Sequence, residues 1–250
     1  YYPHNVHFLW AAAAAEGRSD IALSASRKLE SVTRDGMDEA EFLQEFVAIP
    51  QLTLARFGKW DALLGTPAPT DGRIYLTGVW HYTRGLALLR TGDLTAADAE
   101  LDALGLVAAK PEASELALSG GVASAATLLD VSRLHLAGEI AAARGDTTAA
   151  VASLEEAVSI QDGIPYMEPP PFYFPTRQAL GAVLLDAGRA AEAEAVYRTD
   201  LEQYPSNGWS LYGLARSLRS QGDDAKAEWA QKGFETAWAR ADVELSGSRF

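Results

Sequence analysis

The sequence has no cysteine and far fewer basic than acidic residues. Without cysteine the chain has no disulfide, no thiolate metal ligand and no cysteine nucleophile. Lys and Arg number 21 against 34 Asp and Glu, a net charge of −13, whereas binding to nucleic-acid phosphates requires positive side chains. No apolar run approaches the roughly 20 residues that cross a bilayer. We therefore expect neither a nucleic-acid partner nor membrane insertion.

Sequence motifs of catalysis are also missing. The chain has no GxSxG elbow, no phosphate-binding P-loop and no GxGxxG motif. Carboxylates are abundant, but the pattern singles out no pair for acid–base work. The sequence therefore favours a binding protein over an enzyme, and it predicts no catalytic residue and no cofactor.

What the chain does contain is a recurring pair of apolar helical periods separated by a glycine. Small residues recur seven positions before and five positions after this glycine, as Gly181 and Ala193 do around Gly188. Small side chains at two facing points let paired antiparallel helices approach closely. The turn glycines are at positions 17, 58, 92, 145, 188 and 222. The pattern resembles the tetratricopeptide repeat (TPR) and predicts an all-α, superhelical solenoid of about six helical hairpins.

The spacing of the turn glycines gives the expected boundaries of the repeats. We expect an inserted helical segment, broken around Gly120 and Gly121, at 112–130, and a Pro/aromatic insertion at 163–176 that folds across one face. The tail 242–250 is expected to be extended. The second helix after Gly58 is expected to be short. The repeat domain spans 1–241, with units near 3–36, 44–77, 78–111, 131–164, 174–207 and 208–241.

Several stretches resemble one family of proteins. They are YYPHNVHF, GDTTAAVASLEEAVSIQDGIPYMEPPPFYFPTRQALGAVLL, NGWSLYGLARSLRSQG and the final SRF, and they resemble the C-terminal half of a family of bacterial TPR proteins of unassigned activity. The resemblance covers nearly the whole chain. It implies a soluble bacterial protein of the cytoplasm or periplasm, with a further helical-repeat half before this region. The absence of an initiator Met at Tyr1 agrees with a longer or processed chain.

In the TPR architecture the first helix of each unit lines the concave surface, so the resemblance places a set of polar and aromatic residues there. In the Pro/aromatic insertion, aromatic rings would wall a pocket while Glu168 and Arg177 supply charges; alternatively, the rings seal a gap and the two charges pair at the surface. Trp10, Trp60, Trp229 and Trp238 are expected to serve packing. The candidate binding residues are His4, Asn5, His7, Trp80, His81, Tyr82, His135, Glu139, Tyr166, Glu168, Phe172, Tyr173, Arg177, Gln178, Trp209 and Tyr212.

His4 and His7 are three residues apart and are therefore neighbours on one helical face. Such a pair can share a metal ion, but stable sites usually have three or four protein ligands, and the HExxH zinc signature has a different spacing and a glutamate. Otherwise His4 and Asn5 start the helix while His7 packs inside, or the pair contacts an organic or peptide ligand.

These features predict a module that holds a peptide, a protein segment or a small ligand in a concave groove. One alternative is a metal-binding protein that uses His4 and His7 with further ligands. Another is a structural scaffold in which Ser248-Arg249-Phe250 docks in its own groove or in that of a neighbour. A clamp for chaperone tails is disfavoured, because His7 and Ala11 stand where the resemblance would require lysine and asparagine.

Overall fold

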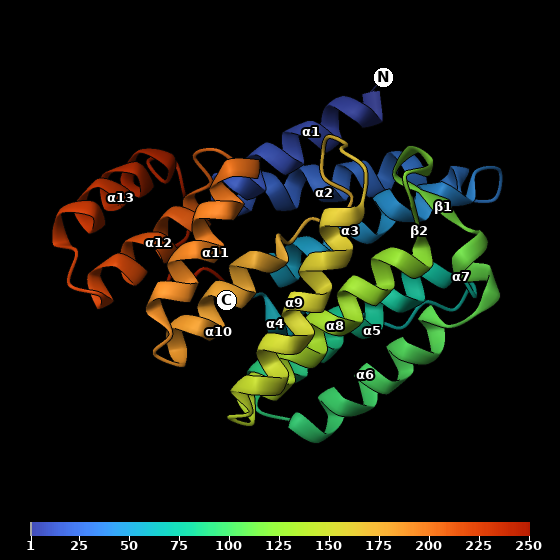
Figure 1. Cartoon of the computed structure of the whole chain (residues 1–250). Helices are drawn as coiled ribbons and strands as arrows, with labels where there is room; N and C mark the ends of the chain where they lie inside the picture. Colours follow the sequence, from blue (N-terminus) through green and yellow to red (C-terminus); the bar gives the residue numbers. More distant parts are fainter. Residues whose placement is uncertain (1) are drawn as a thin grey trace.

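The computed structural model describes residues 2–250, and helices make up nearly all of its regular structure (Figure 1). The prediction of an all-α fold is confirmed. Six helical pairs follow one another, and the two helices of each pair are in contact. The first helices are α1 (Tyr2–Ala15), α3 (Gln44–Arg56), α5 (Ile74–Thr91), α8 (Ala125–Ala143), α10 (Thr176–Asp186) and α12 (Gly208–Ser220). The second helices are α2 (Ser19–Thr33), α4 (Trp60–Leu64), α6 (Leu94–Ala108), α9 (Thr147–Gly163), α11 (Ala190–Gln203) and α13 (Asp224–Ala237).

Three of the six turns between paired helices follow from a local Gly-Asp sequence. Gly92 ends α5 with a φ of 94°, a conformation that favours glycine because it has no Cβ. The side chain of Asp93 then accepts a hydrogen bond from the backbone N–H of Ala96 at 3.0 Å and caps α6. Gly-Asp pairs at 145–146 and 222–223 end and cap helices in the same way.

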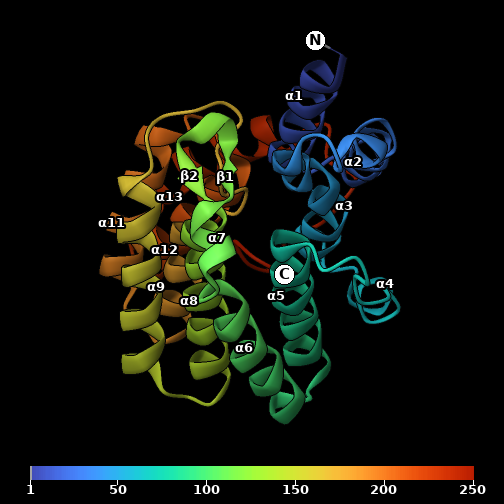
Figure 2. The ribbon, with the colours of Figure 1, turned by 90° about the vertical axis from the view of Figure 1, so that its right-hand side faces the viewer.

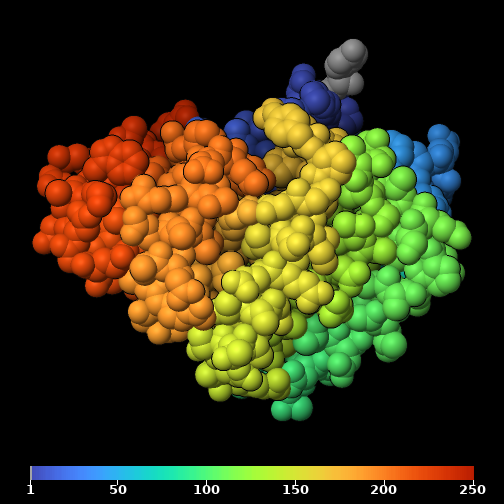
Figure 3. Space-filling view, viewed as in Figure 1, coloured from blue at the N-terminus to red at the C-terminus, as the bar shows by residue number. Residues whose placement is uncertain are grey.

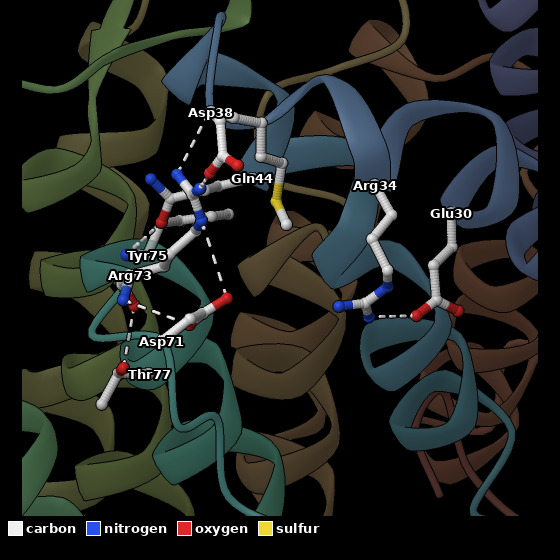
Figure 4. A network of polar contacts seen from close by, with 9 residues as sticks. Glu30, Arg34, Asp38, Gln44, Asp71, Arg73, Tyr75 and Thr77 are labelled. Carbon is white, nitrogen blue, oxygen red and sulfur yellow. Dashed lines mark hydrogen bonds and ion pairs between the residues drawn. The ribbon is translucent and has the colours of Figure 1, made fainter.

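A network before α5 fixes the direction of that helix (Figure 4). Arg73 donates a hydrogen bond to the carbonyl of Met37 at 3.1 Å and forms an ion pair with Asp38. The buried side chain of Gln44 accepts from the backbone N–H of Tyr75 at 3.1 Å, which gives a partner to an N–H that the helix itself leaves free. The start of α5 is thereby tied to α3 and to the segment before it.

The first and last helical pairs touch. Trp238, which follows α13, has its ring against both Gly17 and Gly208, so closely that a Cβ on either glycine would overlap it. The indole N–H of Trp209 donates to the carbonyl of Ala14 at 3.3 Å. The array therefore closes on itself instead of ending in a free last helix.

The segment 112–130 differs from the expected broken helix. After the single turn α7 (Pro111–Glu115), two short strands pair antiparallel, β1 (Ala117–Leu118) with β2 (Ala123–Ser124). The break does lie around Gly120 and Gly121, between α7 and α8, but both glycines have positive φ, 65° and 92°, and reverse the chain into a hairpin instead of merely interrupting a helix. The reversal buries Leu118 in the core.

The Pro/aromatic segment lies on the outside of the array beside α1, where its atoms are yellow and those of α1 dark blue (Figure 3). Alternate residues point inwards: Phe172 and Phe174 are buried in the core cluster around α5 and α8. Tyr166 is 86% exposed. Within residues 2–250, no helix is both long and apolar enough to cross a membrane.

Candidate functional site

The tail segment, residues 242–250, runs between the helical pairs. Figure 2 shows it in dark red, between α5 on one side and α8 and α12 on the other. It is anchored at its start by Asp242, whose carboxylate accepts hydrogen bonds from the backbone N–H groups of Ser19 at 2.7 Å and Asp20 at 3.0 Å and so caps α2. We call the region that holds residues 246–250 the central groove. It is lined by Arg90, Glu139, Gln178, Tyr197, Trp209 and Arg216.

Ser248 is the most deeply buried residue of the tail segment, at 1% exposure. Its hydroxyl donates to the carbonyl of Gln178 at 2.7 Å. Because that proton is used, the hydroxyl of Tyr197, 2.7 Å away, must donate to the Ser248 oxygen. Burial raises the pKa of Tyr197, so the phenol keeps this proton at neutral pH.

Arg249 meets two carboxylates. It forms ion pairs with Glu139 of α8, which is 1% exposed, and with Asp186 of α10 at 3.3 Å. Glu139 also pairs with Arg90 of α5 at 2.7 Å, so one buried carboxylate joins two guanidinium groups. Burial, and then the like charge of Arg90, lowers the pKa of Arg249 to about 9. It is still protonated at pH 7.

Phe250 occupies an aromatic corner of the groove. Its ring stands edge-on to Trp209, with 5.5 Å between ring centroids, and its Cβ lies where a side chain on Gly58 would be, 3.1 Å from an ideal Cβ. The guanidinium of Arg56 lies 3.7 Å from the centroid of the Trp209 ring, a cation–π arrangement.

The tail segment does not fill the groove. A hollow of about 210 Å³ lies beside Ser246–Phe250, between α10 and α12, and another of about 350 Å³ lies beside Arg249, between α8 and α10. A third, of about 40 Å³, is bordered by Arg56, Tyr82 and His135. There is room for a chain longer than residues 246–250 or for larger side chains.

Tyr82 and His135 form part of the groove floor. The Tyr82 hydroxyl and Nδ1 of His135 are 3.1 Å apart, and both side chains are buried. Burial, and then the positive charges of Arg249, Arg90 and Arg56, lower the pKa of His135 to about 3. His135 is therefore a neutral ring at physiological pH.

A second polar cluster lies away from the groove. The Tyr173 hydroxyl is 3.0 Å from Nε2 of His7 and donates to Glu45 at 3.3 Å. Glu45, 3% exposed, also accepts from the backbone N–H and the hydroxyl of Ser119, at 2.7 and 2.8 Å. Burial raises the pKa of Glu45 although these hydrogen bonds oppose it, and burial, then the neighbouring His4, lowers the pKa of His7 to about 4. The cluster joins α1, α3, the β-hairpin and the Pro/aromatic segment.

Removing the bridging hydroxyl of this cluster with Tyr173→Phe is expected to lower the free energy of unfolding by about 1–3 kcal/mol, because two buried polar groups lose a hydrogen bond. Urea unfolding at pH 7 measures the change. Tyr166→Phe is the matched control: at 86% exposure it should change stability by less than about 0.5 kcal/mol. Equal effects of the two substitutions would show that the cluster contributes no stability.

Sequence reasoning missed Glu45 and Ser119. Glu45 shares a helical face with Ala48 and Leu52, which follow it by three and seven positions and are buried; a carboxylate on an apolar face was the available signal. Ser119 left no such signal, because its role depends on the chain reversal at Gly120.

Five predicted residues lie in or at the floor of the groove: Tyr82, His135, Glu139, Gln178 and Trp209. His7 and Phe172 are buried and Tyr173 is half-buried, but all three lie outside the groove. His4 and Asn5 are exposed.

Other predicted residues face neighbouring helices or solvent. Trp80 donates to the carbonyl of Thr66 at 3.0 Å, and His81 is 2.6 Å from Glu100 of α6, so neither lies in the groove. Tyr212 packs on Phe234 of α13, with 5.2 Å between ring centroids. Each residue turns a helix by about 100°, so a register error of one or two positions moves a side chain off the concave face.

The charges of the Pro/aromatic segment do not converge. Arg177 pairs with Asp162 at 2.7 Å and not with Glu168, whose partner is the hydroxyl of Tyr166. Next to them is a largely apolar hollow of about 560 Å³ between α1 and this segment, lined by Phe8, Tyr166, Glu168, Phe172 and Tyr204 among others. Its size exceeds that of the hollows in the groove, but it holds no charged group free of a partner within residues 161–177.

The imidazole rings of His4 and His7 contact different neighbours. His4 lies against Phe8, with 4.7 Å between ring centroids, while Nε2 of His7 meets Tyr173. Among residues 2–250, no group of three or more His, Asp or Glu side chains could hold a metal ion.

The prediction that Trp229 serves packing was wrong, since its side chain on α13 is 64% exposed.

No protein-family model matches the chain. No curated protein matches it either. The function is therefore argued from the geometry of the groove.

Proposed function

We propose that the chain is a TPR-like helical-hairpin solenoid that binds an extended peptide segment in its central groove. The observation that carries the proposal is the docked tail segment, whose last three residues are held by side chains of α5, α8, α10, α11 and α12 and by one backbone carbonyl of α10. Residues far apart in the sequence converge on one short segment, as the residues that line a binding groove converge on a ligand.

Recognition of the main chain favours a peptide over a small molecule. Arg90 donates from Nε to the carbonyl of Phe250 at 2.9 Å, and Arg216 donates from Nη1 to the carbonyl of Ser246 at 2.9 Å. Two carbonyls four residues apart are thus bound by two cations on opposite walls. Contacts of this kind fix an extended backbone whatever its side chains are.

The experiment supplies the segment from outside. In the full chain, the double substitution Arg249→Glu/Phe250→Ser should release residues 246–250, because a carboxylate then faces Glu139 and the aromatic corner is empty. We call this double substitution the release variant. A labelled peptide VELSGSRF should bind this variant saturably, with a dissociation constant on the order of 10 µM by fluorescence anisotropy. The wild-type chain should bind it far more weakly, because its own tail competes at an effective concentration on the order of millimolar.

The same docking favours a second function, a structural scaffold in which the tail segment permanently straps the array. A folded release variant that binds no VELSGSRF up to millimolar concentration would contradict the peptide-binding proposal. If the free energy of unfolding of that variant were also lower than that of the wild type by several kcal/mol, the structural scaffold would be the better explanation.

A further inference from the structure

We infer that the central groove selects a segment of another protein that presents a small hydroxyl residue, an arginine and an aromatic residue in that order, and that this segment displaces residues 246–250. The inference rests on the proposed peptide binding and adds its specificity. Three adjacent subsites, each built from residues outside the tail segment, carry it.

The first subsite fits a serine or threonine hydroxyl. The backbone carbonyl of Gln178 accepts a hydrogen bond from the Ser248 hydroxyl and the Tyr197 hydroxyl donates one to it, each at 2.7 Å. Only a group that donates and accepts at the same atom satisfies both partners. Alanine would leave the buried Tyr197 hydroxyl without an acceptor and would remove one of the bonds to the Gln178 carbonyl.

The second subsite fits a cation, and a guanidinium best. Glu139 is 1% exposed, and its Oε2 atom meets both Arg90 and Arg249. Asp186 stands at the outer end, 3.3 Å from the other nitrogen of Arg249. Two carboxylates along one side chain suit the several fixed donors of arginine better than the single ammonium of lysine.

The third subsite fits a flat ring. Trp209, with no exposed surface, offers its ring to the side chain, and Gly58 leaves the space that a Cβ would close. An edge-on aromatic contact adds to the free energy gained from burial.

Several contacts that hold the groove walls do not involve the tail segment, which favours exchange. Glu139 pairs with Arg90, and Trp209 contacts Phe57 and Trp238. Asp242 continues to cap α2, so only residues 246–250 need to move. The hollows of about 210 and 350 Å³ beside them accept a longer or bulkier segment.

Charge favours a partner from another protein. The chain carries a net charge of −13, which attracts a basic segment over distances of several ångströms and repels a second copy of itself. Arginine at the centre of the motif supplies the complementary charge where Glu139 and Asp186 converge.

The test uses the full chain with Arg249→Glu and Phe250→Ser and labelled VELSGSRF as the probe. Unlabelled peptides compete: VELSGSRF, VELSGARF, VELSGSEF and VELSGSRA. We expect the first to compete best, VELSGARF to be weaker by roughly 10-fold, and VELSGSRA and VELSGSEF by roughly 100-fold or more. Adding Glu139→Gln should reduce the preference for arginine over glutamate, whereas Glu228→Gln, on the exposed face of α13, should not.

Each outcome decides between the claims. Equal competition by all four peptides would overturn the specificity and leave peptide binding standing, while absence of binding by the folded variant would overturn both. A concentration-dependent dimer of the wild-type chain that is lost in the release variant would assign the site to a second copy and overturn the choice of partner. If the release variant fails to fold, millimolar VELSGSRF and VELSGSEF are added to the wild-type chain; a shift of the Trp209 indole proton with the first alone supports the inference, and no difference between them opposes it.

Discussion

Trp209→Ala is expected to lower the free energy of unfolding by about 3–5 kcal/mol. The side chain has no exposed surface, and its ring contacts Phe57 of the second hairpin, Trp238 after the last hairpin and Phe250 of the tail segment. Its indole N–H also donates to the carbonyl of Ala14 in α1. One residue therefore joins the first, second and last helical pairs, and its removal leaves a cavity at the point where the array closes.

Trp229→Ala is the matched control for this prediction. It removes the same side chain from α13, where 64% of it is exposed, so the expected change is within about 0.5 kcal/mol. Urea unfolding followed by far-UV circular dichroism measures both variants under one set of conditions. A loss below about 1 kcal/mol for Trp209→Ala would mean that the closure of the array adds little to stability.

The helical hairpins were within reach of sequence analysis because their signals are local. A turn glycine between two apolar periods depends on a few neighbouring residues, and all six turn glycines have positive φ. Gly181 was predicted as a point of close approach, and an ideal Cβ there would lie 2.4 Å from the Tyr197 ring of α11. The position of the turns and the close approach of paired helices both follow from the spacing of apolar residues and from side-chain size alone.

The contents of the groove were not within reach, because they depend on how the pairs are arranged relative to one another. No pattern in DVELSGSRF indicates that Arg249 will meet Glu139, which lies 110 positions earlier and on another hairpin. Docking of the tail in its own groove was therefore only one of several alternatives. The contacts of Trp238 with Gly17 and Gly208 likewise depend on the summed rotation from each helical pair to the next. Small errors in each predicted rotation add up over six pairs, so such contacts cannot be predicted from the sequence pattern.

The candidate site depends both on local signals and on the arrangement of the helical pairs. The register counted from the turn glycines turned Glu139 and Gln178 inwards, and both border the groove from the first helices α8 and α10. The same register failed at Tyr212, which packs on the second helix of its own pair. A sequence can thus indicate which helices line a groove more reliably than which of their side chains reach a ligand.

Acidification from pH 7 to pH 5 should destabilise the protein through His7 and His135, by about 4 kcal/mol in total. Burial lowers the pKa of His7 to about 4 and of His135 to about 3, against 6.5 in the unfolded chain. As pH falls below 6.5, the unfolded state binds protons that the folded state does not, so the free energy of unfolding decreases. At pH 5 each histidine is about 1.5 pH units below its unfolded pKa, which corresponds to about 2 kcal/mol.

The double variant His7→Gln/His135→Gln isolates this effect. Glu45 and Asp200, whose pKa values burial raises, act in the opposite direction, because a carboxyl with a raised pKa stabilises the fold as it takes up a proton. Both carboxyls are present in both proteins. Asp200 therefore cancels when the change between pH 7 and pH 5 is compared, and the single variant His135→Gln, which leaves the cluster of His7, Tyr173 and Glu45 intact, gives the His135 contribution free of any change at Glu45. Urea unfolding at the two pH values should show a decrease about 4 kcal/mol smaller in the double variant, with each single variant supplying about half. An identical decrease in wild type and double variant would mean that the two rings become charged without opening the fold, and that the interior around Tyr82 and Tyr173 admits water.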